Sequence, residues 1–169
     1  NVLIIRDPIV GKLGVDKPVI DSLDAQGVKY QIFEDVEPEP HVETMQKAMD
    51  IVTNEKIDLV IGTGGGSAMD TAKVAALAPN GKTVLELLDD LSLIHENLPT
   101  ILITTTSGTG SEVSPFAVSA EGTRKRSVVS PHAFATVAIV DPLLTVTMPP
   151  KVTAATGMDA LTHAIEGAT

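Results

Sequence analysis

The stretch from Asp58 to Lys73 constrains the fold more than any other part of the chain. Its apolar run Leu59–Ile61 is typical of a buried strand, and the consecutive glycines Gly64–Gly66 then break the pattern. A helical pattern begins at Ser67, which we expect to cap the helix. A strand, glycine turn and helix in this order direct free backbone N–H groups and the positive end of a helix dipole at an anion. The stretch therefore predicts an anion site, with a plain strand-to-helix turn as the alternative.

The amino-acid composition favours one fold class and argues against several kinds of binding partner. The chain has 169 residues, of which 43% are hydrophobic and only 2% aromatic, which predicts an aliphatic core as in parallel α/β sheets. A net charge of −10 argues against nucleic acid or an anionic membrane surface as partner. The absence of cysteine excludes disulfides and thiolate metal sites. No apolar run is long enough to span a membrane, so we expect a cytoplasmic protein.

The remaining chain alternates strand-like and helix-like segments. Four further apolar runs predict strands, and they lie at Val2–Ile5, Val28–Phe33, Thr100–Thr104 and Ala138–Val140. Helical periodicity covers Val19–Ala25 and His41–Asn54, and a β-hairpin is expected around Glu121-Gly122. Pro149 and Pro150 predict a boundary, with the last helix opening at Thr156 or Gly157. Because the chain starts in a strand pattern and stops in a helix pattern, we expect it to be a piece of a longer protein.

Two polar features are expected at the carboxyl ends of the strands, and a basic cluster is a third candidate for ligand binding. A second glycine turn, Thr105–Glu112, follows another strand, and two such turns on one edge predict a crevice for a nucleotide diphosphate. Asp7 directly follows the first strand, where a carboxylate can accept hydrogen bonds from ribose hydroxyls. The alternative for Asp7 is a turn former before Pro8. The basic cluster Arg124–Arg126 is usually a solvated face, although one of its side chains can reach a bound phosphate.

Asp159 and His163 form the candidate metal pair. A spacing of four residues puts both side chains on one helix face, where they can hold one Fe or Zn ion. The alternative is a hydrogen-bonded surface pair. The apolar neighbours Leu161 and Ile165 predict a packed helix, which favours the metal.

Together, three motifs resemble the iron-containing (group III) alcohol dehydrogenases. They are Gly64-Gly65-Gly66-Ser67 with Asp70 and Lys73, then Thr104–Glu112, then Gly157–Glu166. The resemblance implies an α/β fold with a Rossmann-like parallel sheet that binds the dinucleotide, residues 1–148. It also implies that residues 149–169 are the first helix of an all-α metal-binding domain.

The same resemblance implies roles for individual residues. It implies that the pyrophosphate is bound by Gly65, Gly66, Ser67 and Asp70. It implies that the adenosine half and other parts of the cofactor are contacted by Thr105, Thr106, Thr109, Lys125 and Leu144. Asp7 matches the acidic residue that accepts the ribose hydroxyls, which favours NAD because a 2′-phosphate would meet a like charge. Asp159 and His163 match the first two of four metal ligands.

The activity implied is hydride transfer between an alcohol and NAD. A divalent iron, or zinc in related enzymes, acts as Lewis acid on the alcohol or aldehyde substrate, and no protein nucleophile is needed. Family members are commonly dimers or larger homo-oligomers. The sequence departs from the family pattern in lacking two further histidine ligands, in Thr104 where proline is usual, and in Pro38-Glu39-Pro40 where Pro-Asn-Pro is common.

Two alternatives stay open at this point. One is a zinc glycerol dehydrogenase-type relative, which the Gly108–Glu112 turn disfavours. The other is a truncated, catalytically silent module for nucleotide binding or dimerisation. The sequence from Thr104 to Glu112 also resembles the alcohol dehydrogenase half of bifunctional aldehyde–alcohol dehydrogenases, so a fused parent protein is a further alternative.

Overall fold

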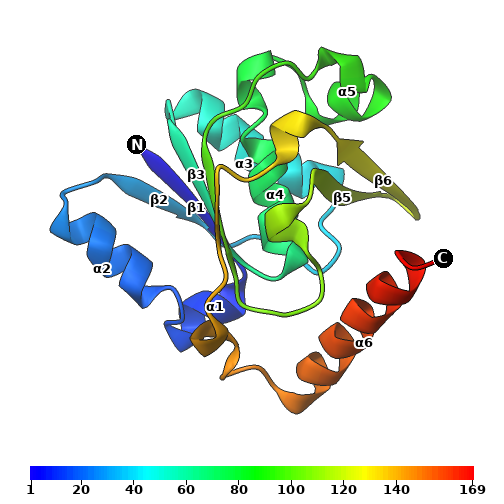
Figure 1. Cartoon of the computed structure of the whole chain (residues 1–169). Helices are drawn as coiled ribbons and strands as arrows, with labels where there is room; N and C mark the ends of the chain where they lie inside the picture. Colours follow the sequence, from blue (N-terminus) through cyan, green and yellow to red (C-terminus); the bar gives the residue numbers. More distant parts are fainter.

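A five-stranded parallel sheet forms the centre of the molecule. The computed structural model describes every residue from Asn1 to Thr169. The strands pair in the order β2-β1-β3-β4-β7, and all of these pairs are parallel (Figure 1). Their bounds are β1 Val2–Arg6, β2 Tyr30–Phe33, β3 Leu59–Gly64, β4 Thr100–Thr104 and β7 Val137–Ile139. The sheet confirms the predicted Rossmann-like α/β class.

Helices connect these strands, and an antiparallel hairpin lies outside the sheet. The α-helices are α1 Pro8–Leu13, α2 Lys17–Ala25, α3 Val42–Asn54, α4 Gly66–Ala75, α5 Val84–Asp89 and α6 Pro150–Glu166. Short 3₁₀ helices cover Ala78–Asn80, Leu91–Leu93, Ser111–Val113, Pro131–Ala133 and Pro142–Thr145. The hairpin consists of β5 Phe116–Glu121 and β6 Arg124–Val129, as the turn at Glu121-Gly122 predicts. No helix is both long and apolar enough to cross a membrane.

The core lies on both faces of the sheet because successive strand residues point to opposite sides. Leu3 and Val60 on one face pack with residues of α3 and α4. Ile4 and Ile61 on the other face pack with residues of α2. A third cluster joins α3, α5 and the hairpin.

Gly62 brings α4 close to the sheet. A Cβ atom built on Gly62 would lie 2.7 Å from the Cβ of Ala72 and 2.8 Å from a methyl carbon of Leu102. Real Cβ atoms do not approach other carbons so closely, so any larger residue would push α4 away from β3 and β4. This close packing fixes the start of α4 relative to the ends of the strands.

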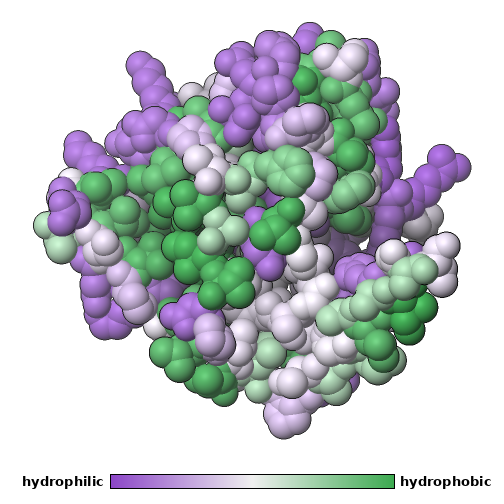
Figure 2. Space-filling view, in the orientation of Figure 1, coloured by the Kyte–Doolittle hydropathy of each residue, from purple (hydrophilic) through white to green (hydrophobic).

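The last helix differs from the expectation in two ways. α6 begins at Pro150 and not at Thr156 or Gly157, because proline's fixed φ and missing N–H suit the first turn of a helix. No residue of α6 is buried in this chain, and Leu161 and Ile165 are 51% and 57% exposed. The prediction of a packed helix was therefore wrong for this chain. α6 extends away from the sheet in Figure 1, and apolar side chains lie on its surface in Figure 2.

Candidate nucleotide-binding site

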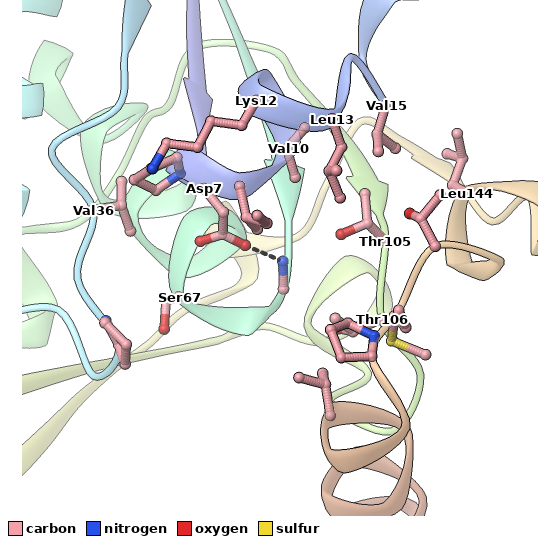
Figure 3. A pocket seen from close by; sticks show the side chains of 18 of the residues that line it. Asp7, Val10, Lys12, Leu13, Val15, Val36, Ser67, Thr105, Thr106 and Leu144 are labelled. Atoms are coloured by element: carbon pink, nitrogen blue, oxygen red, sulfur yellow. Dashed lines mark hydrogen bonds between the residues drawn. The ribbon is translucent and has the colours of Figure 1, made fainter.

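A cavity lies at the carboxyl edge of the sheet, where β1, β3 and β4 end together. Its volume is about 570 Å³, within the usual range for small-molecule sites. Figure 3 shows that α1, the loop after β2, the first turn of α4 and the chain after β4 surround it. The lining residues include Asp7, Lys12, Val36, Gly65, Gly66, Ser67, Thr105, Thr106 and Leu144.

The first glycine turn presents the start of α4 to this cavity. Gly64 has a φ of 147°, a conformation that only glycine adopts readily, and a Cβ there would lie within 2.3 Å of Asp7 Oδ2. Gly65 is the N-cap of α4, and the helix has no side-chain cap. The first N–H groups of a helix have no partner within it, so the amides of Gly66 and Ser67 are available to an anion.

Ser67 does not cap α4, so that prediction was wrong. Gly65 occupies the N-cap position, which places Ser67 inside the first turn. Its hydroxyl accepts a hydrogen bond of 3.3 Å from the N–H of Glu39 instead. The side chain of Ser67 still lines the cavity.

Asp7 joins the first strand to the glycine turn. Its Oδ2 accepts a hydrogen bond of 2.7 Å from the N–H of Gly65 (dashed in Figure 3). Burial raises the pKa of Asp7 above its ordinary value, and the hydrogen bond from Gly65 offsets this only in part. A carboxylate held at the cavity wall can accept hydrogen bonds from ribose hydroxyls and repels a further phosphate.

The second glycine turn supplies two threonines to the opposite wall. Thr105 and Thr106 both line the cavity, and the hydroxyl of Thr106 is buried without a hydrogen-bond partner. Buried polar atoms are nearly always paired, so an orphaned hydroxyl at a cavity wall marks a place where a ligand can bond. The hydroxyl of Thr104, where proline is usual in the family that the sequence resembles, donates to the carbonyl of Thr106 at 2.6 Å and holds this turn.

Asp70 does not line the cavity, and its carboxylate joins three elements. One carboxylate oxygen accepts from the hydroxyl of Ser111 at 2.6 Å, and the other from the N–H of Val118 at 2.9 Å. The fully buried Lys73 lies 3.6 Å from Asp70 and donates to the carbonyl of Phe116 at 2.6 Å. Burial raises the pKa of Asp70 and lowers that of Lys73. These contacts attach α4 to the second glycine turn and to β5.

Thr109 and Lys125 also lie outside the cavity lining. The methyl group of Thr109 lies against Gly66, where a Cβ would approach it to 3.2 Å. Lys125 is on β6, and its Nζ lies 2.7 Å from Oε1 of Glu39. Thr109 therefore packs against the first turn of α4, and Lys125 is held in an ion pair.

The candidate metal ligands share one face of α6. His163 Nε2 lies 3.9 Å from Asp159 Oδ1, and His163 Nδ1 lies 2.9 Å from the carbonyl oxygen of Gly108. Because a carbonyl only accepts, Nδ1 must carry the hydrogen, which leaves Nε2 free to coordinate beside Asp159. No group of three or more His, Cys, Asp or Glu side chains in the chain could hold a metal ion. This chain alone therefore presents two donors and not a complete metal site.

Comparison with known proteins assigns the chain to a family. The family model described as iron-containing alcohol dehydrogenase matches residues 1–142. The chain belongs to the iron-containing alcohol dehydrogenase family.

Relatives in this family agree with the assignment. Long-chain-alcohol dehydrogenase 1 of Geobacillus thermodenitrificans is 49% identical over 98% of this chain and 43% of that protein. Sulfoacetaldehyde reductase of Bilophila wadsworthia is 39% identical over 96% of this chain and 43% of that protein. The chain thus spans less than half the length of these curated relatives.

Solved structures of the iron-containing alcohol dehydrogenase family share the fold. The NADH-dependent butanol dehydrogenase A of Thermotoga maritima superposes with a TM-score of 0.91 at 30% identity, over 98% of this chain and 42% of that one. Sulfoacetaldehyde reductase of Bifidobacterium kashiwanohense, solved in complex with NAD⁺, gives a TM-score of 0.89 at 34% identity. That match covers 99% of this chain and 45% of the other.

Part of the cavity wall was not predicted from the sequence. Helix α1 and its cavity residue Lys12 were not expected, although Pro8 at the helix start and Gly14 at its end are ordinary helix signals. The cavity also includes Val36 and Pro38. From the sequence, their loop stands out only where Pro38-Glu39-Pro40 departs from the family pattern.

Proposed function

We propose that this chain is the cofactor-binding part of an NAD-dependent alcohol dehydrogenase, which transfers a hydride between an alcohol and its aldehyde or ketone. One observation carries the proposal most directly. The uncapped start of α4, with a glycine at its N-cap, and the carboxylate of Asp7 line the same cavity at the carboxyl edge of the sheet. An anion site beside a hydroxyl-accepting carboxylate matches the diphosphate and ribose of a dinucleotide.

Several of the residues that line the cavity would contact the cofactor directly. Gly65, Gly66 and Ser67 would surround the pyrophosphate, because they form the cap and first turn of α4. Thr105, Thr106 and Leu144 would bind along the opposite wall, where the unpartnered hydroxyl of Thr106 supports a polar contact.

Two residues named for the cofactor take a supporting role in this proposal. Both carboxylate oxygens of Asp70 are already engaged, so Asp70 would keep the second glycine turn against α4. Thr109 would hold Gly66 in place through its methyl contact. Lys125, also named for the cofactor, would lie beside it with its charge neutralised by Glu39.

Asp7 is proposed to select NAD over NADP. Its Oδ2 already accepts from Gly65, and its other oxygen remains open to a ribose hydroxyl. A 2′-phosphate at that place would face a buried negative charge, which is unfavourable.

Iron use is proposed from the family, with Asp159 and His163 as two of its ligands. The free Nε2 of His163, with Nδ1 held by Gly108, supports this role. A bound divalent iron would supply Lewis-acid chemistry to the alcohol oxygen. Two donors do not complete a site, so no reaction step is assigned to a metal in this chain.

The domain division and the assembly remain proposals as well. A boundary between residues 148 and 149 is supported by α6, which has no buried residue. Homodimer formation and a cytoplasmic location stay predictions. Because the chain presents only two metal donors, we consider a second candidate function, a module that binds NAD without catalysing turnover.

Calorimetry with NAD tests the proposed function, and Gly65→Ala is the informative variant. A Cβ at Gly65 meets nothing closer than 3.5 Å, so the variant should fold, while its methyl group intrudes on the anion site. We expect NAD to bind the wild-type chain and Gly65→Ala to weaken binding by about tenfold or more, the equivalent of one charge-assisted hydrogen bond.

Gly157→Ala, on α6 in open space, is the matched control and should leave affinity unchanged. Alcohol turnover and metal content measured on the same sample separate the dehydrogenase from the silent module. Failure of NAD to bind the wild-type chain would refute both.

A further inference from the structure

A segment between β2 and α3 crosses the start of α4. We call residues 36–41 the strap. Val36 and Pro38 line the cavity, and the N–H of Glu39 donates to the hydroxyl of Ser67 at 3.3 Å. On its other side the strap meets the hairpin, where the carbonyl of Pro40 accepts from the N–H of Ala120 at 2.9 Å. The strap therefore connects the cavity wall to β5.

Glu39 adopts an unusual backbone conformation within the strap. Its φ is 55°, and only one other non-glycine residue, Lys56, has a positive φ. Such a conformation costs free energy for a residue with a side chain, and its occurrence beside a cavity indicates that the surroundings impose it. The conformation places the carboxylate of Glu39 next to β6, where Oε1 lies 2.7 Å from Nζ of Lys125.

The hairpin register explains why Lys125 is the partner. Lys125 pairs with Ala120 across the two strands, and Ala120 is the residue that bonds to the strap. Glu39 is the only ion-pair partner of Lys125, whereas the neighbouring Arg126 is paired with Asp89 and Glu121. The strap thus brings one carboxylate and one ammonium group together, one residue from the cavity wall.

The charge of this pair bears on anion binding. Glu39 bonds through its backbone to Ser67, which lies in the first turn of α4, where anions are attracted by the helix dipole. The carboxylate of Glu39 itself lies against Lys125 on β6, where it neutralises the ammonium group that would attract a phosphate. Both side chains are well exposed, so neither is needed to complete the core.

We propose that Glu39 sets the affinity of the site for dinucleotides by holding Lys125 in an ion pair, which keeps diphosphate binding weaker than the glycine turn and a free Lys125 together would allow. The inference rests on the proposed NAD function. It makes Glu39 a residue that sets cofactor affinity through Lys125, and it assigns to Lys125 an attraction that is expressed only when Glu39 is absent or displaced.

The test compares the NAD affinities of the wild-type chain, Glu39→Gln and the double variant that adds Lys125→Met, measured by calorimetry at low and high salt. Glu39→Gln should tighten NAD binding by about threefold or more at low salt, the range expected for an exposed ion pair. Lys125→Met in the Glu39→Gln background should return the affinity close to the wild-type value, because the site then again has no net charge from this pair. The gain should shrink at high salt, where exposed charges are screened.

Asp21→Asn is the matched control, since it removes one carboxylate from the exposed Lys17–Asp21 pair on α2, whose residues do not line the cavity. It should not change NAD affinity. Unchanged affinity in Glu39→Gln would overturn the inference, and weaker binding would show that the carboxylate itself contacts the cofactor, which also overturns it. Failure of NAD to bind the wild-type chain would instead contradict the proposed function.

Discussion

Asp7 combines a stabilising contact with a destabilising environment. Its carboxylate accepts the hydrogen bond of Gly65 and closes the gap between β1 and the first glycine turn. Burial nevertheless raises its pKa, which means that the folded protein disfavours the charged form. A residue kept under such a penalty at a cavity wall is expected to serve binding more than stability.

Asp7→Asn should therefore stabilise the chain and weaken NAD binding. Because the folded pKa lies above the unfolded one, ionised Asp7 lowers the free energy of unfolding as pH rises from about 3.8, the ordinary value, through the folded pKa. The melting temperature of Asp7→Asn should exceed that of wild type at pH 7, and the two should converge toward pH 3. Equal NAD and NADP affinities in the wild-type chain would contradict the role given to Asp7.

The placement of these residues could be predicted from the sequence to different degrees. Asp7, Gly65 and Thr105 each follow a strand directly, and parallel strands bring such positions to one edge, so the cavity was predictable. The contacts of Asp70 and Lys125 were not, because they depend on how the β5–β6 hairpin packs, which no local pattern encodes. Ser67 was predicted as the cap because serine is a good one, but the backbone places Gly65 there.

At the scale of elements, α4 depends on two neighbours for its position. Its buried face packs on β3 at Gly62, and its Asp70 is bonded to the loop that leads into β5. The start of α4 therefore points at the cavity only while both contacts are kept. Helix α6 shows the limit of sequence periodicity, since its apolar residues predicted burial that this chain does not provide.

Ser111→Ala tests the contact between α4 and the second glycine turn. It removes the hydrogen bond to the buried Asp70 and leaves that carboxylate oxygen only its ion-pair contact with Lys73 at 3.6 Å, which should lower the free energy of unfolding by about 1–3 kcal/mol. Ser92→Ala is the control, because Ser92 makes a hydrogen bond of the same 2.6 Å length to the exposed Asp90. Chemical denaturation should show a clearly smaller loss for the control, and equal losses would argue against the supporting role of Asp70.

Gly62→Ala tests the close packing of α4 on the sheet. The added methyl group overlaps Ala72 and Leu102, so the variant should lose about 1–3 kcal/mol of stability, as overpacked cores do. It should also weaken NAD binding, because the first turn of α4 moves. A variant with wild-type stability and affinity would show that α4 is not held at this point.

At the scale of the whole molecule, the sheet and its loops form a site whose ligand should stabilise the fold. A ligand that binds only the folded chain adds about 2.7 kcal/mol to the free energy of unfolding at a concentration of 100 times its Kd. NAD should therefore raise the melting temperature in a dose-dependent manner, and the rise should be smaller for Gly65→Ala. A rise of the same size in both would place NAD away from the glycine turn.

The central claim is that the diphosphate of NAD binds at the start of α4. A titration of the ¹⁵N-labelled chain with NAD, followed by amide chemical shifts, tests this most directly. The account predicts the largest shift changes at Gly65, Gly66, Ser67, Thr105 and Thr106, which line the cavity. Saturable shifts confined to other parts of the chain, with these amides unchanged, would contradict it.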